Sequence, residues 1–473
     1  MIDQAPKPPR SLFEKIWQAH RVTDLSGGAS LVAIDRVFLH ERTGSIALKS
    51  LREAGRRIAD PGRVFCTMDH IVDTRPGRGD DTLMPGGRAF ITETREAALD
   101  SGIHLFDVRD PDQGIVHVIS PELAIVLPGT TVVCPDSHTC TQGAMGALAW
   151  GIGSTEAEHA LATGTLRVTR PRSMRIRFDG RLPAGVTAKD LSLAVIARHG
   201  SAGGNGHVVE YAGSAIESLD IEARLTLCNM ATEFSAMTGI IAPDEKTFEY
   251  LAGRRYAPRG DLWERAVAQW RTLSSDEGAS FDREIDFDAS GLEPMITWGT
   301  SPQHAVPISA SVPEQHASGA SRDAYERALA YMGLEPGARL TDLPIDAAFI
   351  GSCTNSRLSD LRRAADVLRG RRIAPGVKAI CVPGSMHVKR AAEAEGLDRV
   401  FTAAGFEWRE SGCSMCFYAG GESFGPRARV VSSTNRNFES RQGPETRTHI
   451  ASPDTVAASA LAGRIADVRR IAA

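Results

Sequence analysis

The segment AAFIGSCTNSRLSDLRRAADVL, residues 347–368, decides the fold class of this chain. Its first five residues predict a buried strand, and the SCTN directly after them predicts a turn. From Leu358 to Leu368, apolar side chains recur at helical spacing. The same order returns in VKAICVPG (377–384) and the helical AAEAEG (391–396). Strand, turn and helix in succession predict an α/β protein with a parallel sheet.

One cysteine lies in this turn and two more follow in SGCSMC, so that Cys353, Cys413 and Cys416 are separated by 59 residues and then by two. Thiolates placed in this way can bind three irons of a [4Fe–4S] cube and leave the fourth iron open as a Lewis acid. A thioredoxin-like redox pair and a structural zinc site are the alternatives for the C-x-x-C pair. The redox pair requires a helix that begins at the motif, and the zinc site requires a fourth ligand at matching spacing.

The composition is that of an ordinary globular protein, with 42% hydrophobic and 24% charged residues over 473 positions. A net charge of −4 gives no general attraction to nucleic acid or to acidic membranes. No apolar run approaches the ~18–20 residues that span a bilayer, and the first residues lack the apolar stretch of a secretory signal. We therefore expect a cytoplasmic protein, or one of an organelle matrix after processing, without nucleic acid or membrane as partner.

Eight cysteines are too few for a disulfide scaffold in a chain of this length, and we expect them to be reduced. Cys66, Cys228 and Cys381 lie among apolar residues and are predicted to be packing thiols. Cys134 and Cys140 flank a polar stretch, and a structural role is favoured for both.

The motifs divide the chain into three α/β subdomains, predicted at 1–170, 171–310 and 311–473. Histidine and aspartate motifs fall in the first, and the cluster cysteines fall in the third. Residues 253–325 are rich in Arg, Asp, Ser and Pro with weak periodicity, which predicts an exposed connector with a few helical turns.

Histidine is paired with aspartate twice, as Asp69–His70 and as Asp136–Ser137–His138. A carboxylate beside an imidazole can fix its tautomer and raise its pKa, as a proton donor near neutral pH requires. A single histidine is more often a satisfied structural residue, but a further His117 in the apolar IVHVI run weakens that alternative. A Ser/His/Asp hydrolase is disfavoured because no G-x-S-x-G surrounds the serine.

A basic, amide-rich run, TNRNFESR (434–441), follows the C-x-x-C pair. Arginine forks bind carboxylates with two hydrogen bonds, which suits a dicarboxylate or tricarboxylate substrate. The alternative is a solvated surface loop.

Together these motifs resemble the aconitase superfamily, and in particular the large subunits of its leucine-pathway branch. The resemblance covers essentially the whole chain and is carried, in order and spacing, by MDH (68–70), GIVHV (114–118), DSHT (136–139), LCNMATE (227–233), GSCTNSR (351–357), GCSMC (412–416) and TNRNFESRQG (434–443). It implies three α/β/α subdomains with parallel or mixed sheets around a central iron–sulfur cluster, without a swivel domain.

The resemblance also implies a hydro-lyase that dehydrates and rehydrates a malate-type dicarboxylate in leucine biosynthesis. One [4Fe–4S] cluster per subunit would be held by Cys353, Cys413 and Cys416. His70 would be the proton donor, oriented by Asp69. Further catalytic roles are implied for His117, Asp136, His138 and Glu233, and substrate or cluster-side contacts for Ser137, Asn229, Asn435, Arg436 and Arg441. Asn229 and Glu233 are spaced to share a helix face.

Single-chain aconitases continue into a swivelling domain that carries a serine base and another arginine, whereas this chain ends at Ala473. We therefore expect a heterodimer with a separate small subunit, and no activity without it. The segment HERTGSIALKSL (40–51) departs from the leucine-pathway pattern and is expected near the substrate's variable group. Citramalate or methylmalate, homoaconitate or a secondary metabolite are alternative substrates. An RNA-binding cluster sensor and a zinc-only structural subunit are rivals from other classes.

Overall fold

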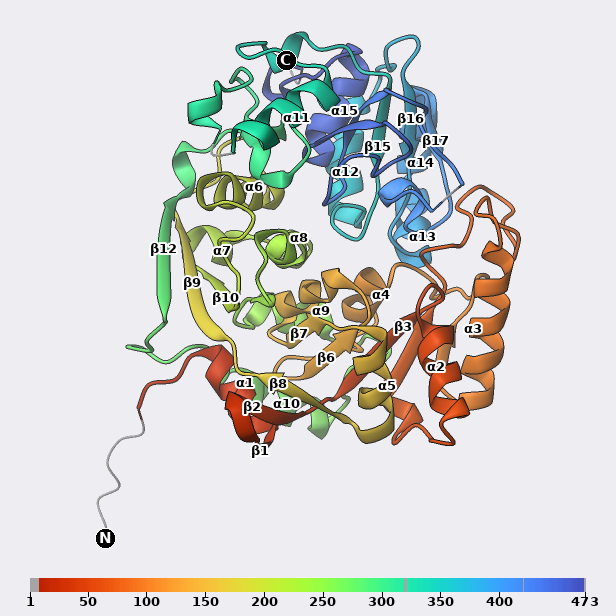
Figure 1. The fold of residues 1–473 in the computed structure, drawn as a ribbon, viewed down its shortest axis with the longest axis vertical. Helices are drawn as coiled ribbons and strands as arrows, with labels where there is room; N and C mark the ends of the chain where they lie inside the picture. Colours follow the sequence, from red (N-terminus) through yellow and green to blue (C-terminus); the bar gives the residue numbers. More distant parts are fainter. Residues whose placement is uncertain (1–7, 319–320, 420, 472–473) are drawn as a thin grey trace.

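The computed structural model describes residues 8–318, 321–419 and 421–471 (Figure 1). Three parallel sheets organise these residues, each with helices packed against it. The predicted α/β class with parallel sheets is confirmed. The sheets fall within 36–151, 172–288 and 347–450. The subdomain limits at 170 and 310 stay a prediction.

The first sheet has five strands in the order β5-β4-β3-β6-β7, all parallel. Its strands are β3 (Arg36–His40), β4 (Val64–Thr67), β5 (His104–Phe106), β6 (Thr131–Cys134) and β7 (Leu148–Gly151). Helices of this region are α1 (Leu12–His20), α2 (Gly44–Glu53), α3 (Gly87–Ser101), α4 (Val116–Glu122) and α5 (Ser154–Thr163). A small antiparallel sheet, β1-β2-β8, is formed by Arg21–Asp24, Ala29–Ala33 and Thr165–Thr169. Strands β4, β3 and β6 are neighbours, so the residues after them lie together at one edge.

The second sheet has four parallel strands in the order β11-β10-β9-β12. These are β9 (Arg172–Asp179), β10 (His207–Ala212), β11 (Thr238–Ile240) and β12 (Arg283–Asp288). The associated helices are α6 (Ala188–His199), α7 (Ser214–Ser218), α8 (Ile221–Asn229), α9 (Glu245–Leu251) and α10 (Asp261–Trp270).

The prediction that 253–325 is only an exposed connector was wrong. Strand β12 pairs with β9 over six residues, and a hairpin of β13 (Met295–Thr297) and β14 (Ala305–Pro307) follows it. Along β12 only Ile285 and Phe287 are buried, because an edge strand with one solvated face alternates polar and apolar residues. The predicted helical turns of this stretch are present as α10.

The third sheet has five parallel strands in the order β17-β16-β15-β18-β19. They are β15 (Ala347–Ile350), β16 (Lys378–Cys381), β17 (Phe406–Trp408), β18 (Arg429–Ser432) and β19 (Arg447–Ile450). The helices here are α11 (Arg322–Met332), α12 (Leu358–Leu368), α13 (Met386–Ala394), α14 (Leu397–Ala404) and α15 (Pro453–Ala462). Strand β15 and helix α12 confirm the strand–turn–helix unit read from the sequence.

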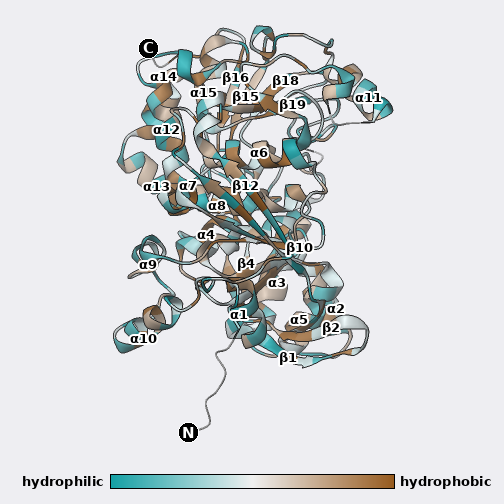
Figure 2. Ribbon diagram, turned by 90° about the vertical axis from the view of Figure 1, so that its left-hand side faces the viewer, coloured by the Kyte–Doolittle hydropathy of each residue, from teal (hydrophilic) through white to brown (hydrophobic). Residues whose placement is uncertain are grey.

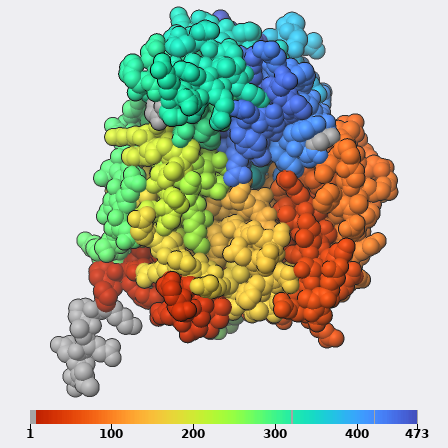
Figure 3. All heavy atoms as spheres, viewed as in Figure 1, coloured from red at the N-terminus to blue at the C-terminus, as the bar shows by residue number. Residues whose placement is uncertain are grey.

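Apolar residues are gathered at the sheets. All four residues of β15 are buried, and in Figure 2 helices α11 and α13 carry much teal, the colour of polar residues. Figure 3 shows the blue C-terminal residues lying against both the orange N-terminal residues and the yellow middle residues. No helix in the described part of the chain has the length and apolar character needed to span a bilayer.

Candidate active site

A cavity of about 330 Å³ lies where the first and third sheets present the carboxyl ends of their strands. The side chains that line it come from segments far apart in the sequence, which meet because parallel strands end at the same edge. They include His40, Arg42 and Thr43, His70, His117, Asp136 to His138, Cys353, Cys413, Cys416, Phe417, Arg436 and Arg441. The structure therefore brings most of the predicted site residues to one cavity.

The three predicted cluster cysteines all line this cavity and are free, buried thiols. Cys353 follows β15 in a turn where Ser352 has a φ of 82°, and Cys413 precedes a 3₁₀ turn over Ser414–Cys416. The C-x-x-C pair thus lies in a short turn rather than at the start of a long helix. This disfavours the redox-pair alternative.

Hydrogen-bond donors surround the sulfurs. The Nδ2 atoms of Asn229 and Asn435 lie 3.2 Å and 3.5 Å from Cys353 Sγ, and Ser352 Oγ lies 3.1 Å from Cys416 Sγ. Burial raises the pKa of Cys353 to about 12, so a bound cation and these donors are needed to hold its thiolate. Three sulfurs at one cavity, with donors beside those of Cys353 and Cys416, fit a [4Fe–4S] cluster with one iron free of cysteine.

The Asp69–His70 pair follows β4, and the His70 ring lies between the carboxylates of Asp69 and Asp136. His70 Nδ1 lies 2.6 Å from Asp69 Oδ1, and His70 Nε2 lies 3.1 Å from Asp136 Oδ2. Burial alone would lower the pKa of His70, but the Asp69 charge and the two hydrogen bonds raise it well above its usual value. Both ring nitrogens then carry a proton, and the imidazolium is a proton donor at neutral pH.

Asp136 joins the histidines of the site. Its Oδ1 accepts hydrogen bonds from His117 Nε2 at 2.9 Å and from the His138 backbone N–H at 2.7 Å. Burial favours the neutral acid, yet these contacts and His70 hold the pKa of Asp136 well below its usual value. On the other side of the ring, Gln142 Nε2 lies 3.3 Å from His117 Nδ1. Asp136 is therefore an ionised junction between three histidines.

A second network connects the histidine side of the cavity to the arginine loop. His138 Nε2 lies 2.8 Å from Glu233 Oε1, and Arg436 Nε lies 2.7 Å from the same oxygen. The expectation that Asn229 and Glu233 share one helix face was wrong, because α8 ends at Asn229 and Glu233 lies in the following 3₁₀ turn, Met230–Phe234. Asn229 nevertheless reaches Cys353, and Glu233 reaches the cavity through Arg436.

Arg441 differs from Arg436 in having no carboxylate partner in the described part of the chain. Its guanidinium lies over the rings of Phe417 and Phe438, and its Nη2 is 3.8 Å from Cys416 Sγ. The side chain of Ser137 also lines the cavity, 3.4 Å from His138 Nδ1.

His40 and Glu41 lie in the segment 40–51 that was expected near the substrate, but neither was predicted as a site residue. His40 ends β3 and Glu41 follows it, and the His40 ring stacks on the His70 ring at 4.0 Å. Burial lowers the pKa of His40 to about 4, so this ring is neutral beside the charged one. The sequence signals were the position of HERT directly after the apolar run of β3 and the departure of 40–51 from the leucine-pathway pattern.

His40, Glu41, Asp69 and His70 place their side-chain ligand atoms within 4.8 Å of one another, as a metal site would. The Glu41 and Asp69 oxygens, however, already accept backbone N–H groups, and the His70 nitrogens face two carboxylates. Hydrogen bonds therefore use the Glu41, Asp69 and His70 atoms that a metal would need.

The sequence model of the Aconitase family (aconitate hydratase) matches residues 14–463 of this chain. The chain belongs to the aconitase family. Among its relatives is the 3-isopropylmalate dehydratase large subunit 1 of Bradyrhizobium diazoefficiens, which is 54% identical over 462 residues, 97% of this chain and 96% of the relative. The resemblance read from the sequence, the aconitase-like fold and the class of hydro-lyase are confirmed.

Aconitase-family dehydratases of this type use a [4Fe–4S] cluster, and the three cysteines of the cavity fit one. The words "large subunit" in the relative's name imply that the relative has a small-subunit partner. The roles of the individual side chains stay predictions.

Proposed function

We propose that this chain is the large, catalytic subunit of a 3-isopropylmalate dehydratase, which interconverts 2-isopropylmalate and 3-isopropylmalate in leucine biosynthesis. One observation carries the proposal: the His70–Asp136 pair and the three cysteines line the same cavity. Proton transfer and a cluster site thus lie within reach of one small substrate. The relative that is 54% identical supports the choice of substrate.

The His70 imidazolium is the proton donor of the reaction. Its Nε2 proton goes to the hydroxyl that leaves the substrate, and Asp69 at Nδ1 keeps the ring oriented. In the rehydration step the same nitrogen takes the proton back from water. Asp136, whose two oxygens contact the His70 and His117 rings directly, lies beside that water.

Arg436 and Arg441 bind the carboxylates of the substrate. Arg436 is held in place by Glu233, whereas the Arg441 fork is free to form two parallel hydrogen bonds. Cys353, Cys413 and Cys416 hold the cluster, with Asn229 and Asn435 donating to Cys353. When bound, the cluster supplies a Lewis-acid iron for the hydroxyl of the substrate.

The base that removes the carbon-bound proton is placed on a small subunit, because the superfamily carries it on a swivelling domain. We propose a heterodimer that closes over the cavity, in the cytoplasm. The eight free cysteines of the chain support a reducing compartment.

The test is anaerobic reconstitution of the chain with iron, sulfide and the small subunit of its own organism. Loss of the alkene absorbance of 2-isopropylmaleate in the complex, and in neither subunit alone, is the expected result. Reconstituted complex that hydrates no unsaturated diacid overturns the proposal. So does anaerobically purified protein that contains zinc without iron and sulfide.

Arg42 favours a second candidate, a tricarboxylate substrate such as homoaconitate. Its side chain lines the cavity with Arg436 and Arg441, has no carboxylate partner in the described residues, and lies with its guanidinium 4.9 Å from the Phe417 ring centre. A third guanidinium suits a third carboxylate better than an isopropyl group. Comparing kcat/KM of the complex on isopropylmalate and on homoaconitate decides between the two.

A further inference from the structure

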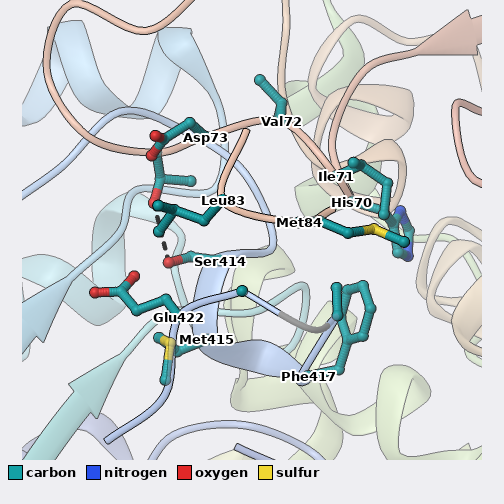
Figure 4. Close-up of a pocket in the computed structure, with 13 residues that line it drawn as sticks. His70, Ile71, Val72, Asp73, Leu83, Met84, Ser414, Met415, Phe417 and Glu422 are labelled. Atoms are coloured by element: carbon teal, nitrogen blue, oxygen red, sulfur yellow. Dashed lines mark hydrogen bonds between the residues drawn. The ribbon is translucent and has the colours of Figure 1, made fainter. Parts of the chain in front are cut away.

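The segment 69–72 carries His70 but belongs to no helix or strand. Its four backbone N–H groups therefore have no ladder or helix partner, although Asp69 itself is completely buried. On one side, residues 70–74 line a cavity of about 60 Å³, with Ser414, Met415 and Phe417 across from them (Figure 4). The segment is open to a cavity there, so its position depends on what holds it from the other side.

Glu41 lies on that other side. It follows β3, whose neighbour β4 leads into the segment, and the Glu41 side chain has no exposed surface. Its Oε2 accepts the N–H of Asp69 at 3.0 Å. Its Oε1 accepts the N–H groups of His70 at 2.7 Å and Val72 at 3.2 Å, and also that of Ile71.

One carboxylate thus binds four consecutive N–H groups of the segment that presents the proton donor. Displacing this segment from Glu41 would leave buried N–H groups without an acceptor, which is strongly disfavoured. The mouth of the substrate cavity is lined by His40 and Arg42, the neighbours of Glu41, but not by Glu41 itself. Glu41 therefore has no direct route to the substrate.

We propose that Glu41 is a positioning residue for the proton transfer: its carboxylate fixes the backbone of 69–72 and thereby places the His70 ring between Asp69 and Asp136. This inference rests on the proposed function of His70 as proton donor. Arg436 and Arg441, which bind the carboxylates of isopropylmalate in the proposed function, are on a different segment, so loss of Glu41 lowers turnover and leaves their contacts with the substrate in place. General acid–base catalysis contributes about 10²–10⁴ in rate, and misplacement by about 1 Å can cost about 10².

The experiment compares Glu41→Gln and Glu41→Ala with Glu210→Gln in the reconstituted complex. Glu210 is also a buried carboxylate, hydrogen-bonded to Ser275 Oγ at 2.8 Å, but it lies on β10 outside the cavity. Hydrogen–deuterium exchange is measured on peptides spanning 68–74, and kcat and KM are measured with the same substrate.

The glutamine keeps one acceptor oxygen and the alanine keeps none. We expect kcat to fall about tenfold in the first and about a hundredfold in the second, with KM within roughly threefold. Exchange of 68–74 should rise in the same order while the rest of the chain is unchanged. Glu210→Gln should alter neither kcat nor exchange in this segment.

A folded Glu41→Ala complex with wild-type kcat overturns the inference, and so does one with wild-type exchange at 68–74. A rise in KM equal to the loss of kcat/KM, with kcat unchanged, also overturns it. The exchange readout needs no substrate. A wild-type complex that is inactive on every diacid therefore refutes the proposed function, while exchange still tests the Glu41 contact.

Discussion

The Nδ2 atom of Asn229 lies 3.2 Å from the sulfur of Cys353, and its Oδ1 accepts a hydrogen bond from Thr354 Oγ1 at 2.8 Å. The amide thus contacts the sulfur through one end and Thr354 through the other. Asn229 ends α8 of the middle region, whereas Cys353 follows β15 of the third sheet. The thiolate is thus stabilised by a donor from another part of the chain, and residues that hydrogen-bond to metal ligands commonly act in this way.

Replacing Asn229 by Asp is expected to make the cluster more labile. The substitution removes the N–H donor and puts a carboxylate beside an anionic sulfur, where like charges repel. We expect the visible cluster absorbance to bleach about tenfold faster in air, since outer-shell partners are typically worth 10–100-fold in metal affinity. Asn205→Asp, an exposed position, is the charge-matched control. Equal bleaching rates in the two variants would show that this contact does not stabilise the cluster.

Removing the proton donor should abolish turnover while substrate binding persists. We expect His70→Gln to lower kcat by about 10³-fold, because the imidazolium is lost and an amide cannot protonate a leaving hydroxyl. KM should change by roughly threefold or less, because the arginines are untouched. His20→Gln is the control, since His20 also lies 2.8 Å from an aspartate, Asp35, but is outside the cavity. A His70→Gln enzyme with near-normal kcat would remove this histidine from the mechanism.

The strand-end positions could be read from the sequence, because a strand, a turn and a helix leave local patterns. Cys353 was placed correctly after a buried strand for that reason, and it lines the cavity. Glu41 could not be found in this way. Its importance lies in hydrogen bonds to backbone N–H groups of an irregular segment about thirty residues away. Every residue except proline has such a group, so the amino-acid sequence does not mark these ones.

Strand β12 was missed for a different reason. Its sequence, REIDFD, is mostly charged, and the two apolar positions are too few to stand out within 253–325. The alternation of polar and apolar residues was nevertheless present, and it is typical of an edge strand with one solvated face. The break between α8 and the 3₁₀ turn that carries Glu233 had no such signal, since LCNMATE contains neither Gly nor Pro.

Arg441 should determine affinity for the substrate. Its guanidinium is stacked on two rings and its Nε is buried without a partner in the described residues, so its fork is preformed for a carboxylate. A charge-assisted hydrogen bond is worth about 1.5–3 kcal/mol, so Arg441→Ala should raise KM about 10–100-fold. Arg441→Lys should restore little of the affinity lost in Arg441→Ala, because lysine lacks the planar guanidinium fork.

The control for this prediction is Arg327→Ala. Arg327 lies on α11, is 75% exposed and pairs at 3.4 Å with Glu439, which is on the loop that carries Arg441; neither residue lines the cavity. A similar KM for the Arg441 and Arg327 variants would mean that positive charge near this loop matters in general, rather than one bidentate contact of Arg441.

His304 makes the stability of the chain depend on pH. Its ring stacks on Trp298 at 4.5 Å, and both ring nitrogens are buried without a hydrogen-bond partner in the described residues. Burial lowers the pKa of His304 from 6.5 to about 4. Between pH 6.5 and about 4, the unfolded chain therefore binds a proton at His304 that the folded chain does not bind. The free energy of unfolding must fall as the pH drops through this window.

Replacing His304 by Phe keeps the stacked ring and removes the titration. From pH 7.5 to pH 5.5 the free energy of unfolding of the wild type should fall by roughly 1 kcal/mol more than that of His304→Phe, as measured by urea unfolding. His159→Phe, at an exposed position, should follow the wild type. If the His304→Phe and wild-type curves run parallel, the buried ring is already protonated in the folded chain. The absence of a partner at both nitrogens argues against that, because a buried imidazolium needs an acceptor or a counter-charge.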